Sequence, residues 1–306
     1  MNKINILMST YNGGEYLTEQ INSIMEQRDV DVFLSIRDDG SSDDTVSIIK
    51  EMQKKYKNKI YLFEGTNIGY RASFMRLIDW AVDADYYGFS DQDDVWDPYK
   101  CINGIAKLKK INDDISLYLS SLTITDENLN TLFFMDYSKA INSIESYFVR
   151  QRYAGCTYIF TPKLKNIVRR LCDLFNTSSN MPDHDFIVAA CGYACGSVYI
   201  DNNPNLIKHR RLLTSVTSGG NGLVKRIQVE YNLVFNRYKI QSNMARFLLQ
   251  KCKLWIKQDN LEFLYSVANY DKKRVNKIKL LRNKDFTSGM WLCDIETKFK
   301  IMVSKY

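Results

Sequence analysis

The segment Ser90–Asp94 places three carboxylates within four positions, directly after the short apolar run Tyr86–Phe89. That run predicts a buried strand, because it is apolar, aromatic and bounded by polar residues. Three carboxylates so close together repel one another, and such clusters persist when a divalent metal lies between them. Because open α/β sheets bind ligands at the carboxyl ends of their strands, the segment predicts a metal-bound phosphate ligand at a sheet edge. The alternative is a solvated acidic turn that caps a helix starting near Pro98.

Two earlier strand ends carry similar polar turns. The strand predicted at residues 33–36 is followed by Asp38, Asp39 and a glycine. The strand predicted at residues 4–8 is followed by the polar stretch 9–15. A plain strand–turn–helix connection explains a glycine but does not need two adjacent carboxylates. Three polar strand ends in the first hundred residues therefore predict a nucleotide site at one sheet edge.

Strands and helices alternate over the first 110 residues. Apolar periodicity predicts strands near 4–9, 32–37, 60–64 and 86–90, and helices near 14–27, 43–56 and 70–82. This alternation predicts an α/β fold with a mostly parallel, doubly wound sheet.

The pattern changes after residue 115. The sequence predicts a hairpin between 117–124 and 132–135, a strand at 156–161, a helix at 162–175 and an apolar helix ending at Cys195. Residues 215–222 are rich in serine and glycine, which predicts a loop and a domain boundary. Everything after Leu223 is predicted to be helical.

Composition narrows the class of protein. The 306 residues are 45% hydrophobic, enough for a sizeable core, but no run of 18 uncharged apolar residues predicts a transmembrane helix. The N-terminus lacks the apolar core of a signal peptide. Seven cysteines, an odd number without C-x-x-C spacing, predict buried, reduced thiols in a cytoplasmic protein.

Charge is distributed unevenly along the chain. Residues 201–306 hold 21 Lys+Arg and 8 Asp+Glu, whereas residues 1–200 hold 21 and 27. A basic final third suits anionic lipid, anionic substrate or nucleic acid, and solvated lysine-rich helices are the plain alternative. The stretches 246–257 and 272–284 mix bases with aromatic and aliphatic residues. That mixture favours a helix on an anionic membrane surface over a nucleic-acid contact.

An ordered set of segments carries a resemblance to a known family. The segments are Ser9–Leu17, Asp38–Thr45, Asn67–Gly69, Phe89–Trp96, Ala154–Thr157 and His184–Asp185. With them the chain resembles the family 2 inverting glycosyltransferases, which have the GT-A fold. It is most similar to the rhamnosyltransferase-like branch found in bacterial surface-polysaccharide assembly.

The resemblance implies a division of the chain into domains. Residues 1–215 would form the GT-A domain, with a nucleotide-binding half at 1–110 and an acceptor half at 111–215. Residues 223–306 would form a basic helical tail, in which no family signature is found.

The resemblance also implies a donor site. The nucleotide-sugar-binding residues that it implies are Ser9, Tyr11, Glu15, Asp38, Gly69, Arg71 and Asp91. Tyr11 would stack on a pyrimidine base, and Asp38 would accept the N3–H of uracil or thymine, a donor that cytosine lacks. Arg71 would contact base or phosphate, with a solvent-exposed arginine at a helix start as the alternative. Asp91 and Asp93 would hold Mg²⁺ or Mn²⁺ against the diphosphate, with Asp94 in support.

Asp185 matches the catalytic base of the family. Inversion needs one carboxylate that takes the proton of the acceptor hydroxyl as it attacks the anomeric carbon. An acid that caps the following helix is the plain alternative, and Asp183 is the competing base if the register slips.

One departure from the family pattern concerns a histidine. Relatives carry Tyr-Arg-x-His beyond the base, but here Leu212 takes the place of that histidine. Either His209 or the pair Arg210 and Arg211 would compensate by binding diphosphate, or the metal site is weakened.

The resemblance predicts an inverting, metal-dependent glycosyltransferase that uses a UDP- or dTDP-sugar, with dTDP-L-rhamnose among the donors. Its acceptor would be a growing, lipid-linked cell-surface polysaccharide at the inner face of the cell membrane. Two other functions compete: a degenerate module that binds nucleotide sugar without catalysis, and a metal-dependent phosphohydrolase. The latter would need more histidine ligands than the two histidines present.

Overall fold

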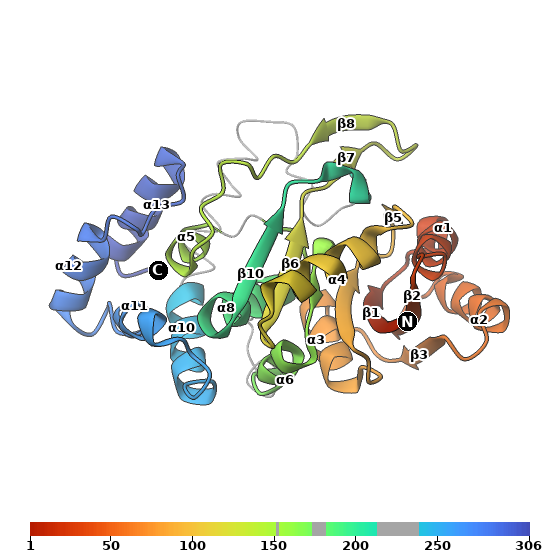
Figure 1. Ribbon diagram of the computed structural model, residues 1–306, viewed down its shortest axis with the longest axis horizontal. Helices are drawn as coiled ribbons and strands as arrows, with labels where there is room; N and C mark the ends of the chain where they lie inside the picture. The colour runs from red at the N-terminus through yellow and green to blue at the C-terminus, as the bar shows by residue number, and fades with distance from the viewer. Residues whose placement is uncertain (151–152, 173–181, 213–238) are drawn as a thin grey trace.

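A seven-stranded, mostly parallel sheet forms the centre of the computed structural model, which describes residues 1–150, 153–172, 182–212 and 239–306 (Figure 1). In spatial order its strands are β10 (Ser197–Asp201), β6 (Ser116–Ser120), β9 (Ile159–Phe160), β4 (Tyr86–Ser90), β1 (Asn2–Thr10), β2 (Val30–Asp38) and β3 (Ile60–Glu64). Only β9 runs antiparallel to its neighbours, β4 and β6. The predicted α/β fold with a mostly parallel sheet is therefore confirmed.

Helices cover both faces of this sheet. They are α1 (Gly14–Met25), α2 (Thr45–Lys55), α3 (Tyr70–Trp80), α4 (Lys100–Ile111), α5 (Ile144–Val149), α6 (Pro162–Arg169) and α8 (His184–Cys195). Successive residues of a strand point to opposite faces, so Ile4 and Ile6 of β1 join the layer with α1, α2 and α4. Leu7 joins the opposite layer, with α3, α6 and α8.

A second, small sheet lies beyond the carboxyl end of β4. Its strands are β5 (Val95–Trp96), β11 (Ile207–Arg210), β7 (Thr123–Thr125) and β8 (Thr131–Phe134), in that spatial order. The antiparallel pairing of β11 with β5 brings the chain after residue 206 back to the acidic segment near residue 94. Two short 3-10 helices, η1 (Gly155–Thr157) and η2 (Pro204–Leu206), complete this half of the protein.

Three predictions for the second half need correction. Residues 116–120 do not pair in the predicted hairpin, because they are buried in the main sheet beside β9 and β10, and only β7 pairs with β8. In the strand predicted at 156–161, only Ile159–Phe160 forms a strand. The helix predicted from residue 162 ends at Arg169. The predicted loop at 215–222 lies outside the described residues.

The C-terminal helices continue the core of the main domain. They are α10 (Ile240–Lys251), α11 (Gln258–Ala268), α12 (Arg274–Arg282) and α13 (Trp291–Met302). Met244 and Leu248 of α10 are fully buried in the same apolar cluster as α8, and the Lys257 amide donates to the carbonyl oxygen of Ala194 at 2.9 Å. Six of the seven cysteines are buried, as predicted. Among the described residues, no helix has the length and apolarity needed to cross a membrane.

Candidate active site

The polar turns predicted at three strand ends meet at one edge of the sheet. β1 lies between β4 and β2 and is parallel to both. Thr10 is paired with Asp38, and Met8 is paired with Ser90, so the three strands end side by side. This register places the chains that follow Thr10, Asp38 and Ser90 around a common site.

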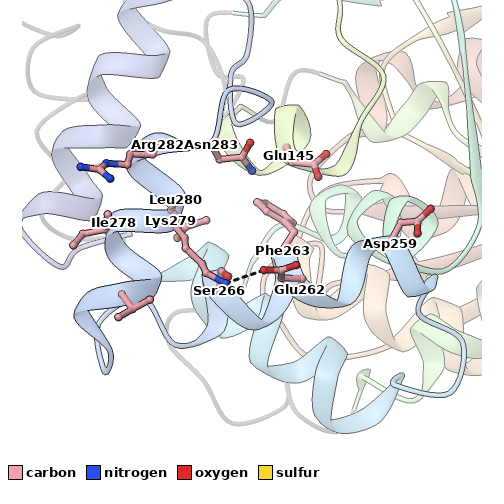
Figure 2. A pocket seen from close by; sticks show the side chains of 11 residues that line it. Glu145, Asp259, Glu262, Phe263, Ser266, Ile278, Lys279, Leu280, Arg282 and Asn283 are labelled. Carbon is pink, nitrogen blue, oxygen red and sulfur yellow. Dashed lines mark hydrogen bonds and ion pairs between the residues drawn. The ribbon is translucent and has the colours of Figure 1, made fainter.

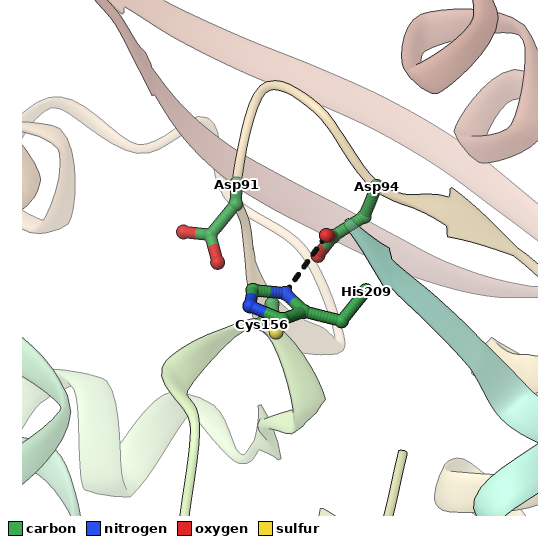
Figure 3. A group of neighbouring side chains, drawn as sticks. All are labelled: Asp91, Asp94, Cys156 and His209. Atoms are coloured by element: carbon green, nitrogen blue, oxygen red, sulfur yellow. Dashed lines mark ion pairs between the residues drawn. The ribbon is translucent and has the colours of Figure 1, made fainter. Parts of the chain in front are cut away.

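Four side chains that could hold a cation gather beyond the end of β4. They are Asp91, Asp94, Cys156 of η1 and His209 of β11, and one ligand atom of each lies within 4.8 Å of the others (Figure 3). Asp94 is fully buried, and its Oδ1 lies 2.8 Å from Nδ1 of His209. From the sequence, Asp94 was expected only to support the metal ligands, and no role was predicted for Cys156. His209 was predicted to bind diphosphate, as one replacement for the histidine missing at Leu212, and not to lie against Asp94.

The electrostatics of this cluster favour a positive ion. Burial and the charge of Asp94 raise the pKa of Asp91 to about 6. Burial and the same charge raise the pKa of Asp93 to about 7. The charge of Asp94, opposed by burial, raises the pKa of His209 to about 10. The raised pKa values mean that these side chains hold protons more tightly, because negative charge is concentrated around them. A divalent cation would neutralise the same charge and displace those protons.

The residues present fit a divalent metal. Both oxygens of Asp94 are buried without a hydrogen bond of good geometry from the described residues. Carboxylate oxygens such as these suit Mg²⁺ or Mn²⁺, and a neutral imidazole is a further ligand. Burial raises the pKa of the Cys156 thiol well above its ordinary value, so this group stays protonated and adds no negative charge.

Asp93 lies beside this cluster rather than within the group of four. Its backbone carbonyl accepts a 2.9 Å hydrogen bond from Nε of Arg210. The guanidinium of Arg210 also pairs with Glu19 and lies 4.5 Å from the centre of the Tyr16 ring. Arg210 is therefore committed to holding the acidic turn, whereas His209 faces the carboxylates. The role of Asp93 as a metal ligand stays a prediction.

Tyr11 and the acidic segment are joined through Gln92. The Tyr11 amide donates to Oε1 of Gln92 at 2.9 Å, and Nε2 of Gln92 donates back to the Tyr11 carbonyl at 3.3 Å. The Tyr11 ring itself is 49% exposed, so its face is open for stacking. Ser9 donates through its hydroxyl to Ser73 at 2.6 Å, and this bond ties β1 to α3.

Asp38 is buried with four hydrogen bonds to its carboxylate. Oδ1 accepts from the hydroxyls of Thr10 and Ser41 at 3.0 and 2.5 Å. Oδ2 accepts from the amides of Gly40 and Ser41 at 3.1 and 2.9 Å. These bonds fill the lone pairs of the carboxylate. A nucleobase would have to displace a hydroxyl to reach Asp38, and the base-reading role stays a prediction.

Asp39, to which the sequence gave no separate role, fixes the loop before α3. It pairs with Arg37 at 2.5 Å and accepts from the amides of Ile68 and Gly69, each at 2.8 Å. Gly69 has φ of 82°, a conformation that favours glycine. Gly69 therefore shapes this loop, and Glu15, at the start of α1, is exposed.

Arg71 reaches across to the start of α8. Its Nε donates to Oδ1 of Asp183 at 2.5 Å, and the Tyr70 hydroxyl donates to the same oxygen at 2.7 Å. Burial, followed by the charge of Asp183, raises the pKa of Tyr70. Asp183 is thus engaged by a cation and a phenol, which makes it poorly suited to take a proton from an acceptor.

Asp185 lies one residue inside α8 and has a different environment. Its Oδ1 accepts the amide of Phe186 at 2.7 Å. Burial, with a further contribution from the charge of Asp183, raises the pKa of Asp185 to about 7. The charge of Asp91 acts in the same direction. Asp185 lies against Gly155, whose neighbour Cys156 belongs to the acidic cluster, so the two border one site. A carboxyl that titrates near neutral pH is suited to general-base chemistry.

His184 is a packing residue beneath this site. Its ring stacks on Phe74 with centroids 3.8 Å apart and meets the ring of Phe89 edge-on at 4.8 Å. Burial lowers the pKa of His184 to about 3, so the imidazole is neutral. Its aromatic contacts hold the first turn of α8, and with it Asp185, against β4.

Gly155 allows η1 to approach the start of α8. A Cβ at this position would lie 2.9 Å from Nε2 of His184 and 3.2 Å from Cβ of Asp185. Gly155→Ala is therefore expected to displace Asp185 and to destabilise the fold by about 1–3 kcal/mol, the usual cost of overpacking. Turnover should fall more than donor affinity, measured by steady-state kinetics and calorimetry.

Gly192→Ala, in α8 with Asp185, is the matched control. Its added Cβ would lie no closer than 3.3 Å to the nearest atom, a side-chain atom of Leu117. We expect turnover within a few-fold of the unaltered protein. Equal turnover in Gly155→Ala and Gly192→Ala would show that the approach of η1 does not position Asp185.

A separate cleft of about 600 Å³ lies between α11 and α12, with α5 at its edge (Figure 2). The residues that line it are Glu145, Asp259, Glu262, Phe263, Ser266, Val275, Ile278, Lys279, Leu280, Arg282 and Asn283. Lys279 and Glu262 already form an ion pair of 2.8 Å across it. None of the acidic-cluster residues lines this cleft, so it is distinct from the candidate site.

A mostly parallel α/β sheet, with an acidic cluster at its carboxyl edge and helices appended at the C-terminus, defines the GT-A class of nucleotide-sugar transferases. The family described as "Glycosyl transferase family 2" matches residues 5–167. The chain therefore belongs to glycosyl transferase family 2, and the resemblance found in the sequence is confirmed.

Individual relatives agree with this assignment. The chain is 32% identical over 207 residues to the dTDP-rhamnosyl transferase RfbG of Shigella flexneri, covering 65% of this chain and 70% of that protein. The structure resembles S. aureus TarS 1-349 in complex with UDP-GlcNAc, with a TM-score of 0.59, 15% identity and coverage of 99% and 82%. It also resembles the mannosyltransferase PcManGT of Pyrobaculum calidifontis in complex with GDP-Man and Mn²⁺, with a TM-score of 0.52, 14% identity and coverage of 99% and 88%.

Proposed function

We propose that this glycosyltransferase moves a sugar, with inversion, from a UDP- or dTDP-sugar to a lipid-linked cell-surface polysaccharide at the inner face of the cell membrane. The observation that carries the proposal is the pairing of Asp185, a carboxyl titrating near neutral pH, with a cation-binding cluster at the same edge. One side of such a site can hold a diphosphate, and the other can take a proton.

The donor would lie along the ends of β1, β2 and β4. The open face of Tyr11 would stack on the base, and Asp38 would accept the N3–H once a hydroxyl is displaced. Asp91, Asp94 and His209 would hold the metal, Mg²⁺ or Mn²⁺, and Asp93 lies close enough to assist. When bound, the metal supplies positive charge that stabilises the leaving diphosphate.

Asp185 would act on the acceptor side. Its carboxylate takes the proton of the acceptor hydroxyl while that oxygen attacks the anomeric carbon from the face opposite the leaving group. The ion pair of Arg71 with Asp183 supports this role, because it leaves Asp185 as the nearby acid not held by a guanidinium. The buried ring of His184 keeps the first turn of α8 in place.

His209 offers a replacement for the family histidine that is missing at Leu212. The histidine expected at position 212 is replaced by leucine, yet His209 of β11, three residues earlier, lies against Asp94. This contact supports a working metal site and weighs against a catalytically degenerate binding module.

A donor screen by thermal shift in the presence of Mn²⁺ tests the proposal. UDP- or dTDP-sugars at about a hundred times their Kd should stabilise the protein by about 2.7 kcal/mol, raising Tm by several degrees. CDP-sugars are the control, because cytosine offers no N3–H. The name of the relative RfbG favours dTDP-L-rhamnose as the first donor to try. Equal stabilisation by CDP-sugars, or none by any donor, would contradict the proposed site.

A further inference from the structure

Helix α13 exposes an apolar face to solvent at one end of the molecule (Figure 1). Its members are Trp291 (70% exposed), Leu292 (62%), Ile295 (56%), Phe299 (45%) and Met302 (56%), with Val303 (42%) directly after the helix. Residues at spacings of four and seven lie on one side of a helix, so these side chains form one continuous stripe. Scattered exposed apolar residues are ordinary, but a contiguous stripe of large ones marks an interaction surface.

The opposite side of α13 is the side that packs against the protein. Thr297 and Ile301 are buried, and the Thr297 hydroxyl donates to the Val149 carbonyl at 3.4 Å. Just beyond the helix, the Tyr306 hydroxyl donates to the carbonyl of Phe148 at 2.8 Å. These contacts fix α13 on α5, so the apolar stripe cannot be buried by turning the helix over. A surface helix normally carries polar residues on its outer side, whereas the exposed residues of α13 are all apolar except Lys298.

The segment that contains α12 and α13 is rich in basic residues. Residues 272–306 hold 10 Lys+Arg and 3 Asp+Glu. The exposed cations are Lys272, Lys273, Arg274, Lys279, Arg282, Lys284 and Lys298. Two of the cations are paired with acids, Lys300 with Glu296 and Lys279 with Glu262 of α11. The segment still has a net charge of +7, from 10 basic and 3 acidic residues, and this charge complements an anionic surface.

We propose that the α13 stripe docks the protein on an anionic lipid bilayer. The helix would lie in the plane of the interface, with Trp291 and Phe299 at the boundary of the acyl chains and the flanking lysines among the headgroups. Apolar insertion combined with basic attraction is what stable interfacial binding requires. The surface is separate from the donor site and from Asp185. The inference rests on the proposed function, which it deepens by naming the helix that would hold the protein at the membrane.

The sequence predicted a membrane-surface helix in residues 246–257 and 272–284, and the structure corrects the first of these stretches. Cys252 and Ile256 are buried, and Trp255 is partly buried beneath the guanidinium of Arg170, 4.5 Å from the ring centre. Among the apolar residues of 246–257, only Leu254 is exposed, to 91%. That residue lies between α10 and α11 and supplies a matched control.

Flotation of the full chain with vesicles tests the proposal. Vesicles of equal parts phosphatidylglycerol and phosphatidylcholine should bind the protein, and vesicles of phosphatidylcholine alone should bind it less. The triple variant Trp291→Ser, Ile295→Ser, Phe299→Ser should reduce binding by at least about tenfold, the effect of withdrawing one large apolar side chain. Leu254→Ser should float like the unaltered protein. Added salt should weaken binding in part.

Tryptophan fluorescence gives a readout that needs no destabilising change. Brominated lipid in the anionic vesicles should quench the emission of Trp291 in the unaltered protein. Trp291→Phe should remove most of this quenching while flotation continues. Quenching that persists in Trp291→Phe would assign insertion to another part of the chain and overturn the proposal.

Two further outcomes would overturn it. One is failure of the unaltered protein to float with anionic vesicles, or equal flotation of the triple variant. The other is a dimer that the triple variant converts to a monomer without loss of flotation, which would assign the stripe to a second copy. Calorimetry of UDP or dTDP with Mn²⁺ on each variant reports an intact donor site, so loss of membrane binding and failure of the proposed function are distinguished.

Discussion

Replacing Asp185 with asparagine is expected to lower turnover by about 10²–10⁴-fold, the usual contribution of a general base. Asparagine keeps the shape of the side chain and can still accept the Phe186 amide, but it cannot take a proton. Donor affinity should change little, because this group acts mainly in the transition state. Steady-state kinetics with one donor and one accepted acceptor measure the first effect, and calorimetry measures the second.

The pH dependence of turnover sharpens this test. Because the pKa of Asp185 is raised to about 7, the base is protonated and inactive at lower pH, so kcat/KM should fall as pH drops through about 7. The residual activity of Asp185→Asn should lack this limb. If the fall in kcat/KM below pH 7 survives in Asp185→Asn, another group is responsible for it, such as the acidic cluster.

Asp183→Asn is the matched control for Asp185→Asn. It loses the ion pair with Arg71 but keeps an oxygen that can accept from the Tyr70 hydroxyl, so a milder fall in turnover is expected. Inactive Asp183→Asn beside near-normal Asp185→Asn would move the base two residues upstream. Two near-normal variants would remove the base from this segment.

Asp94→Asn is expected to weaken Mn²⁺ binding by more than about 100-fold. Substituting a residue that only hydrogen-bonds to a metal ligand already lowers metal affinity by about 10–100-fold. Asp94 is the buried carboxylate of the cluster, so its substitution should have a larger effect. Titration calorimetry of Mn²⁺ with UDP or dTDP measures the loss. Nucleotide binding in the absence of metal should survive and shows that the variant is folded.

Asp93→Asn separates the two assignments of the metal ligand. The sequence predicts Asp93 as a ligand with Asp91, whereas the geometry favours Asp94 with His209. We expect Asp93→Asn to weaken Mn²⁺ less than Asp94→Asn does. The reverse order would restore the pair Asp91 and Asp93 and place Asp94 in support.

Most of the first half of the fold could be predicted from the sequence. β1 to β4 lie where the apolar runs predict them, because each run is local and is bounded by turn residues. The predicted hairpin forms at its turn, between β7 and β8, but the prediction that residues 117–120 belong to it was wrong for a physical reason. β6 is buried on both faces, and a strand of that kind carries no alternation that reveals its partners. Its neighbours, β9 and β10, come from distant parts of the chain.

The candidate site could also be predicted only in part from the sequence. The sequence identifies the carboxylates of the Ser90–Asp94 segment, since repulsion among them needs a local explanation. Which of them faces the cluster depends on the path of the turn and on β11, which brings His209 to Asp94. Cys156 arrives through η1. No spacing in the sequence predicts these side-chain contacts, because strand pairing between segments far apart in the chain brings the residues together.

The C-terminal helices show the same limit most clearly. Their basic charge and their apolar residues are properties of composition, and the sequence by itself determined both. Which apolar residues face inward was decided only by the tertiary structure, which buries Met244 and Leu248 of α10 and leaves Trp291 and Ile295 of α13 exposed. The reason is that burying an apolar side chain lowers the free energy whichever apolar surface covers it. The pattern of apolar residues therefore reveals which side chains tend to be buried, but not what they pack against.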